Sequence, residues 1–131
     1  DTVYEANHIQ FSVHLNVDCG QIPIKDYDLC IVLGNLLDNA LQANDKIEIL
    51  EREVLIEIET TENSKFRIHS ENPLPEHDFD VQKNILHHGY GLENMKKVVS
   101  ENHGFVTIRT AEYFVIDILI PIIAEKDAFI R

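Results

Sequence analysis

The chain is poor in cysteine and has no long apolar run. Its two cysteines, Cys19 and Cys30, lack the spacing of a metal-ligand pair, so we expect reduced thiols in a cytoplasmic protein. No apolar stretch approaches the roughly 20 residues that a membrane-spanning helix needs. Because residue 1 is Asp rather than Met, we expect a piece of a longer protein.

Basic residues are also scarce. Eleven Lys and Arg stand against 23 Asp and Glu, which gives a formal net charge of −12. Nucleic-acid binding depends mainly on Lys and Arg that neutralise phosphates, so we expect no nucleic-acid partner. For the same reason the chain is a poor candidate for binding an anionic membrane surface. An acidic domain binds a polyphosphate only through a local site, built from backbone amides, a helix end or a metal ion.

The sequence does contain enough apolar material for one core. Its 131 residues are 44% hydrophobic and 26% charged, which predicts a single domain over 1–131. Apolar residues at three- and four-residue steps predict helices at 26–43 and 91–102. Alternation of apolar and polar residues predicts strands at 9–17, 53–61, 65–70, 105–110 and 113–122. This order predicts an α+β two-layer sandwich, with the helices on one face of a mixed, mostly antiparallel sheet.

Three stretches lie outside these elements. Residues 1–8 have little pattern and are expected to be the end of a helix whose body lies upstream. Residues 46–52 either extend the first helix or form a short connector. Residues 73–88 are polar, contain two prolines and lack a helical period. An irregular stretch of this length inside a compact domain is usually a functional lid or a mobile segment.

The helix at 26–43 contains Asn35 and Asn39 within an apolar run. Residues i and i+4 project from the same helical face. Asparagine is a poor helix former because its side chain competes for the backbone, so the pair needs a reason. Either the amides face solvent or bond to neighbouring backbone, or they form a polar strip in a ligand site. A carbonyl oxygen of Asn is a suitable ligand for Mg²⁺.

Two further stretches could contact a ligand. Residues 88–94 place Gly89 and Gly91 at the start of a helix, where glycine allows close approach and free N–H groups attract an anion. The alternative is a simple loop-to-helix junction. The two-residue period of a strand puts Ser70 and Asn72 on one face with apolar residues before them, so that face becomes polar at its end. A polar side chain there is placed to recognise a base, unless the strand simply turns at Asn-Pro.

Together these features resemble the Bergerat-fold, or GHKL, ATPases. The matching order is an Asn-x-x-x-Asn-Ala helix, a strand with a polar end, a lid, and Gly-x-Gly-Leu before a second helix. The residues at 33–41 and 88–95 look most like sensor histidine kinases of peptide quorum sensing, the Agr/Com type. The resemblance covers about residues 9–121.

The resemblance implies a role for each motif. Asn39 corresponds to the asparagine that coordinates Mg²⁺ on the ATP phosphates. Asn35 stands where hydrolysing members have a glutamate base; an amide cannot take the proton, so ATP would wait for a better nucleophile than water. Asn72 takes the place of the aspartate that accepts the adenine amino group, with Glu71 as the competing candidate. The other implied nucleotide-binding positions are Asp38, Gln42, His88, Gly89, Tyr90, Gly91, Leu92 and Asn94.

The implied function is that of the ATP-binding catalytic domain of a bacterial two-component sensor histidine kinase. With ATP and Mg²⁺, such a domain transfers the γ-phosphate to a histidine on an upstream dimerisation segment. Residues 1–8 would be the remnant of that segment, and 73–88 would be the ATP lid. The expected partners are the same segment and a response regulator, in a membrane-anchored homodimer whose catalytic domain is cytoplasmic.

Two alternatives stay open. Pro73 and Pro75 replace the glycines that usually follow the base-recognising aspartate of this superfamily, which favours a degenerate, nucleotide-free domain that serves as a protein-interaction module. A serine-protein kinase of the anti-sigma-factor type shares the expected fold.

Overall fold

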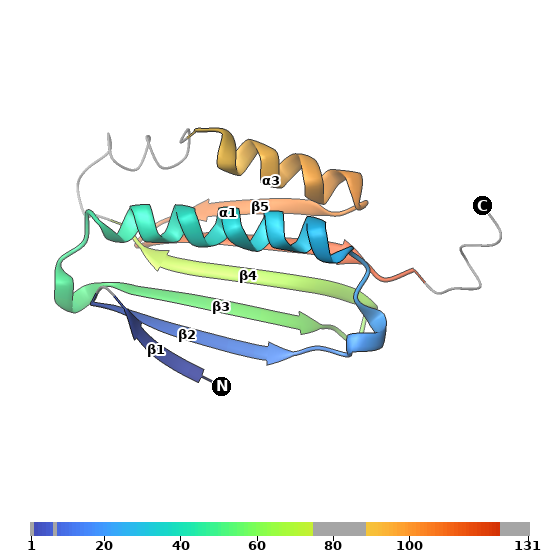
Figure 1. The fold of residues 1–131 in the computed structure, drawn as a ribbon, viewed down its shortest axis with the longest axis horizontal. Helices are drawn as coiled ribbons and strands as arrows, with labels where there is room; N and C mark the ends of the chain where they lie inside the picture. Colours follow the sequence, from blue (N-terminus) through green and yellow to red (C-terminus); the bar gives the residue numbers. More distant parts are fainter. Residues whose placement is uncertain (1, 7, 75–88, 124–131) are drawn as a thin grey trace.

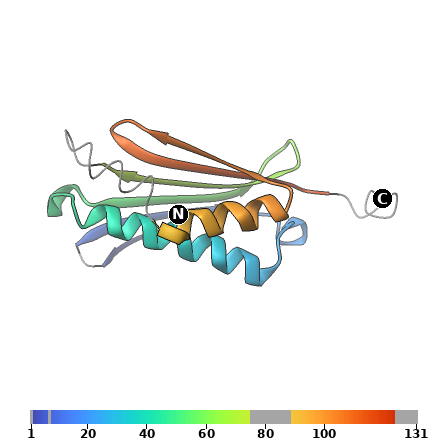
Figure 2. The same ribbon diagram turned by 90° about the horizontal axis from the view of Figure 1, so that it is seen from above.

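The computed structural model describes residues 2–6, 8–74 and 89–123. These residues form two layers, a six-stranded sheet and two helices packed on one of its faces (Figures 1 and 2). The helices are α1 (Asp26–Asn44) and α3 (Gly89–Glu101). The strands are β1 (Thr2–Ala6), β2 (Ile9–Asn16), β3 (Glu53–Thr60), β4 (Lys65–Pro73), β5 (Phe105–Thr110) and β6 (Tyr113–Pro121).

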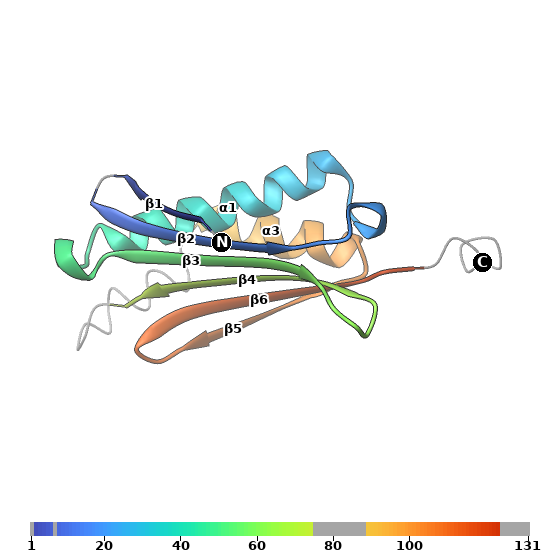
Figure 3. The same cartoon turned by 90° about the horizontal axis from the view of Figure 1, so that it is seen from below.

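The sheet is mixed and mostly antiparallel. Its strand order is β1-β2-β3-β4-β6-β5, which can be followed in Figure 3. The neighbours β2 and β3 are parallel, and each other pair is antiparallel. A parallel pair needs a long crossover, and α1 supplies it between β2 and β3. The predicted α+β two-layer sandwich is therefore confirmed. No helix in the described residues is long and apolar enough to cross a bilayer.

The first strand corrects one prediction. Residues 2–6 form β1, where the sequence analysis expected the end of a helix. The strand pairs antiparallel with β2, from Thr2 opposite Val13 to Ala6 opposite Ile9. Thr2, Val3 and Tyr4 are strand-forming residue types, and pairing with β2 satisfies backbone groups that a short helix end would leave open. The expected helix remnant is therefore wrong for these residues.

The segments between the helices and strands differ less from the predictions than β1 does. Within 46–52 the chain makes a short 3-10 turn at Ile49–Glu51, so this stretch is a connector and does not extend α1. Strand β4 continues to Pro73, three residues beyond the predicted end at 70, and Pro73 pairs with Tyr113. Most of the predicted lid, residues 75–88, lies outside the described residues. Both cysteines are free and exposed.

The core lies between the sheet and the two helices. Alternate residues of β4 and β6 face the helices, which contribute apolar residues at helical spacing. The most deeply buried side chains are Val32, Leu36, Phe66, Ile68, Met95, Val99, Phe114, Ile116, Ile118 and Ile120. Burial of an aliphatic or aromatic side chain of this size contributes about 1.5–3 kcal/mol. This layer packs α1 against β4 and α3 against β5, with the two helices side by side.

The opposite face of the sheet carries a network of charged side chains around His69, which is 5% exposed. Its Nδ1 lies 2.7 Å from a carboxylate oxygen of Asp117, and its Nε2 lies 2.8 Å from one of Glu71. Arg67 and Arg109 contact Asp117 at 2.9 and 3.1 Å. The network therefore joins β4, β5 and β6 on the face away from the helices.

Candidate functional site

A stripe of polar side chains runs along α1 beside the core. Each helical residue is rotated by about 100° from the one before, so Asn35, Asp38, Asn39 and Gln42 share one side of the helix. Exposure follows the rotation away from the core side: Asn39 is 9% exposed, Asn35 is half-buried, and Asp38 and Gln42 are exposed. The prediction that Asn35 and Asn39 share a face is confirmed, and Asn39 lies deepest.

The amides of Asn35 and Asn39 are not used to satisfy the protein backbone. Among the described residues, neither amide has a hydrogen-bond partner, and no completely buried side-chain nitrogen or oxygen lacks one. Their polar atoms must therefore still reach the surface. Asn44 is the opposite case, because it is fully buried, donates to the carbonyls of Ala40 and Glu53, and accepts from the Glu53 N–H. The two upstream asparagines thus remain open to a ligand, whereas Asn44 ties α1 to β3.

The first turn of α3 approaches Asn35 closely. A Cβ placed on Gly91 would lie 3.2 Å from Asn35 Oδ1, so glycine leaves the room that the amide occupies. Figure 1 shows the start of α3, the C-terminal half of α1 and the end of β4 at the same end of the molecule. The two motifs that are 56 positions apart in sequence, 91 − 35, therefore form the two walls of one site.

A cleft of about 590 Å³ opens between these walls. Among the described residues it is lined by Asn35, Gly91, Glu93, Asn94 and Lys97. The predicted contact Asn94 is therefore in the lining. Asn39 and Gln42 lie further along α1, outside this lining but on the same side of the helix. The cleft has an amide wall on α1 and a wall on α3 that carries one cation and one carboxylate.

Asn72 lies on the sheet beneath the helices. It is 1% exposed and shares the core face with Phe66, Ile68 and Ser70, as the strand period predicts. Its amide nitrogen donates to the Pro73 carbonyl at 3.3 Å. The competing candidate Glu71 belongs to the opposite face, where it contacts His69. Of the two residues, only Asn72 is on the side of the helices.

The remaining predicted positions are distributed differently. Leu92 is 3% exposed and packs in the core, so its side chain supports the start of α3 and does not line the cleft. Gly89 and Tyr90 begin α3. His88 lies outside the described residues. Lys97 and Glu93 were not among the predicted positions, although Lys97 lies three residues after Asn94 and four after Glu93, spacings that share a helix face.

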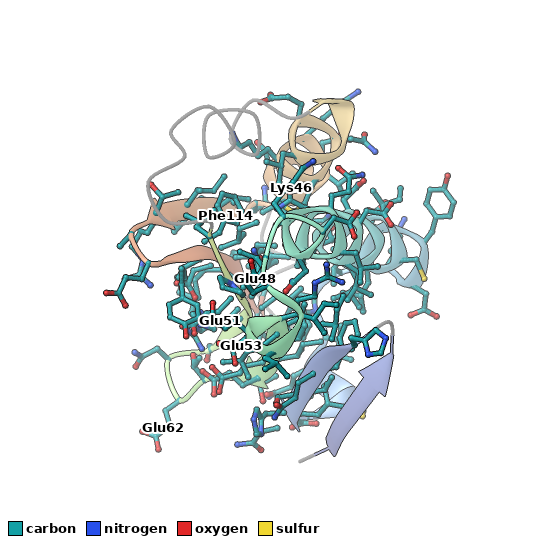
Figure 4. The ribbon with its side chains drawn as sticks, turned by 90° about the vertical axis from the view of Figure 1, so that its left-hand side faces the viewer. Lys46, Glu48, Glu51, Glu53, Glu62 and Phe114 are labelled. Carbon is teal, nitrogen blue, oxygen red and sulfur yellow. The ribbon has the colours of Figure 1, made fainter. Side chains whose placement is uncertain are left out.

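Two smaller hollows lie at the end of the sheet, on the face away from the helices, with volumes of about 380 and 210 Å³. Both are lined by Glu53 and Tyr113. A hydrogen bond to Glu53 and the negative charge of Glu53 raise the pKa of Tyr113, and burial adds to this. Figure 4 shows Glu48, Glu51 and Glu53 gathered at this end of the molecule. This concentration of carboxylates disfavours a polyphosphate, so the cleft between α1 and α3 is the better candidate.

The described residues contain no group of three His, Cys, Asp or Glu side chains that could hold a metal ion by themselves. A Mg²⁺ ion at α1 would therefore depend on one or two protein oxygens, together with water and phosphate oxygens. That is the usual mode for Mg²⁺, which gives up its waters reluctantly. The oxygen-only donor set of Asn35 and Asn39 fits this mode.

Solved structures of histidine kinases share this fold. The histidine kinase AdeS of Acinetobacter baumannii has a TM-score of 0.61 at 15% identity, over 87% of this chain and 55% of its own. The mycobacterial sensor histidine kinase MprB has a TM-score of 0.64 at 17% identity, over 87% and 82%. The histidine kinase domain of the E. coli osmosensor EnvZ has a TM-score of 0.58 at 15% identity, over 86% and 76%. This chain therefore spans just over half the length of the AdeS chain.

A search of curated protein sequences found no match to this chain. The family model for the GHKL domain matches residues 24–121, which include α1, β4, α3 and the whole candidate site. The match covers most of the chain, and the fold agrees with that of the histidine kinase structures. The chain therefore belongs to the GHKL domain family.

Proposed function

We propose that this domain binds ATP with Mg²⁺ and is the catalytic domain of a bacterial two-component sensor histidine kinase. The observation that carries the proposal is the close approach of Gly91 to the Asn35 amide, which brings the two sequence motifs to one cleft. The buried Asn72 supplies a polar group on the sheet, next to the last residue of β4.

Different residues of the site suit the base, the metal ion and the phosphates of the nucleotide. Asn72 is the candidate for contact with the base, as an amide that can both donate and accept. Asn39 would supply an oxygen to Mg²⁺, and the ion would neutralise part of the charge of the phosphates. The start of α3 directs free N–H groups toward an anion, and Gly91 lets the backbone come close.

The amide of Asn35 favours transfer of the phosphate to another nucleophile over hydrolysis by water. A general base must accept a proton, and the neutral amide of Asn35 does not do so at physiological pH. Water is therefore poorly activated in this cleft, and transfer to a better nucleophile is favoured over hydrolysis. We propose that this nucleophile is a histidine on an upstream dimerisation segment of the same protein. The further partner would be a response regulator, and the full-length protein a membrane-anchored homodimer of the Agr/Com quorum-sensing type with this domain in the cytoplasm.

Isothermal titration calorimetry tests the first step. Wild-type protein is titrated with a non-hydrolysable ATP analogue, with and without Mg²⁺. Asn39→Ala should reduce the gain in affinity that Mg²⁺ provides. Asn63→Ala, an exposed asparagine in the β3–β4 turn, is the matched control and should leave that gain unchanged. No binding of the analogue to wild type at millimolar concentration would rule out the proposal.

One observation favours a second candidate, a nucleotide-free interaction module. Strand β4 stays regularly paired through Pro73, so no glycine loop follows Asn72. Autophosphorylation of the full-length protein with labelled ATP separates the two candidates. Incorporation of label excludes the nucleotide-free module, and a phosphohistidine rather than a phosphoserine excludes the anti-sigma type of kinase.

A further inference from the structure

The charge balance of the domain poses a problem for a polyphosphate ligand. The chain has a net charge of −12, so its overall field repels a triphosphate. Binding then depends on positive charge close to the phosphates. Among the described residues that line the cleft, Lys97 is the one cation, and Glu93 is the one carboxylate.

Among the described residues, Lys97 is available to bind a ligand, whereas several other cations are paired within the protein. The adjacent Lys96 pairs with Glu93 at 3.6 Å, which partly neutralises the cleft's carboxylate. Lys97 has no ion pair within the described part of the chain. Three of the arginines are engaged: Arg67 and Arg109 contact Asp117 on the opposite face, and Arg52 donates to the Ile47 carbonyl.

Lys97 lines the same cleft as Gly91 at the start of α3 and Asn35 on α1. Helical side chains lean toward the N-terminus of their helix, over the residues three and four positions earlier, which for Lys97 are Asn94 and Glu93 of the same lining. The opposite wall of the cleft is Asn35. The buried amide of Asn72, the candidate for base recognition, lies on the sheet beneath the helices. If the phosphates of the nucleotide lie between Asn35 and the start of α3, as the proposed function has it, they share the cleft with Lys97.

We propose that Lys97 binds the terminal phosphate of the nucleotide and makes the domain prefer the triphosphate over nucleotides with fewer phosphates. This inference rests on the proposed function, because it assigns a specificity role within the same cleft. Lysine acts as a point charge on a flexible stem, so its contribution depends on the number of phosphate charges and on salt.

The test is calorimetry with three ligands in the absence of Mg²⁺ and then in its presence: a non-hydrolysable ATP analogue, ADP and adenosine. In Lys97→Ala the affinity for the ATP analogue should fall by about five- to tenfold. Affinity for adenosine should not change, and the affinity for ADP should fall less than that for the analogue. The dependence of analogue binding on salt concentration should also weaken. Lys97→Arg, which keeps the charge, should restore most of the preference.

Lys25→Ala is the matched control, because it removes the same charge from an exposed site just before α1, at the far end of that helix. It should leave all three affinities unchanged within about twofold. Thermal melts of both variants check that folding is intact. Equal loss for adenosine and for the ATP analogue in Lys97→Ala, or equal behaviour of the two alanine variants, would overturn the assignment. Failure of wild type to bind any of the three ligands would instead overturn the proposed function itself.

Discussion

The side-chain oxygen of Asn35 lies 3.2 Å from the point where a Cβ of residue 91 would stand. Cβ contacts of this length are uncommon, so a side chain at residue 91 requires the Asn35 amide to shift by a few tenths of an ångström. The absence of a side chain at Gly91 therefore leaves the Asn35 amide in its place at the cleft. The contact joins the two motifs of the site. A substitution at residue 91 should therefore affect nucleotide binding without a matching loss of folding stability.

Gly91→Ala should weaken binding of the ATP analogue by about three- to tenfold, because the Asn35 amide has to move. Alanine is the better helix former, so the free energy of unfolding should stay the same or rise by up to about 1 kcal/mol. Calorimetry and urea unfolding measure the two effects. Loss of binding together with a large loss of stability would contradict this explanation.

Gly34→Ala provides the control for that substitution. Gly34 lies within α1, and a Cβ there meets nothing within 4 Å. The variant should gain about 0.5–1 kcal/mol of stability by the same helix-forming effect and leave nucleotide affinity unchanged. A similar loss of affinity in both variants would show that the position of residue 91 is not the cause.

Most elements could be predicted from the sequence because their local pattern is strong. The apolar spacing in 26–43 placed α1 to within one residue of its end, and strand parity put Asn72 rather than Glu71 on the helix side. Strand β1 could not be predicted, because residues 2–6 are few and owe their structure to pairing with β2. A tertiary contact decided their conformation, not a local preference.

The site was predictable where residues carry a motif and less so where only packing places them. Asn35 and Gly91 each stood in a recognisable pattern, although their contact depends on how α1 and α3 pack. Lys97 belongs to a helix face whose partner is not visible in the sequence, so no sequence pattern marks it as part of the site. Asn44 looked like one more polar residue at a helix end, whereas the fold encloses it completely.

Asn44→Ala should lower the free energy of unfolding by about 2–4 kcal/mol. The substitution removes three hydrogen bonds and leaves the N–H and carbonyl of Glu53 without these partners. Urea unfolding measures the change. Gln42→Ala, an exposed amide two positions earlier, should change stability by no more than about 0.5 kcal/mol. A loss in Asn44→Ala as small as that of the control would contradict the structural role of Asn44.

Gly104→Ala should destabilise the domain by about 1–3 kcal/mol through overpacking. A Cβ at this position would lie 2.5 Å from the Leu119 carbonyl oxygen and 2.7 Å from a side-chain carbon of Ile120. Backbone of β6 cannot yield as a flexible side chain does. Gly20→Ala is the control, since its Cβ would meet only Asp18 at 3.4 Å, an ordinary contact. Thermal melts should order the variants with Gly104→Ala clearly lower.

The carboxylate of Asp117 should make the stability of the domain fall in acid. Burial raises its pKa, but the hydrogen bond and charge of His69, together with Arg67 and Arg109, outweigh burial and hold the pKa below its ordinary value of 3.8. The folded state therefore binds a proton on Asp117 less readily than the unfolded chain does. The resulting stability is complete above the unfolded pKa of 3.8 and is lost as pH falls through the lower pKa of the folded state.

Asp117→Asn removes this contribution. It should lower the free energy of unfolding near neutral pH by about 1–3 kcal/mol and flatten the decline of stability below about pH 4. Asp45→Asn, at the exposed C-terminal end of α1, should keep the wild-type pH profile. Urea unfolding at a series of pH values compares the three proteins. If Asp117→Asn declined in acid as steeply as wild type, other carboxylates would have to account for the acid sensitivity. The contacts of Asp117 with the His69 network would then contribute little to the pH dependence of the free energy of unfolding.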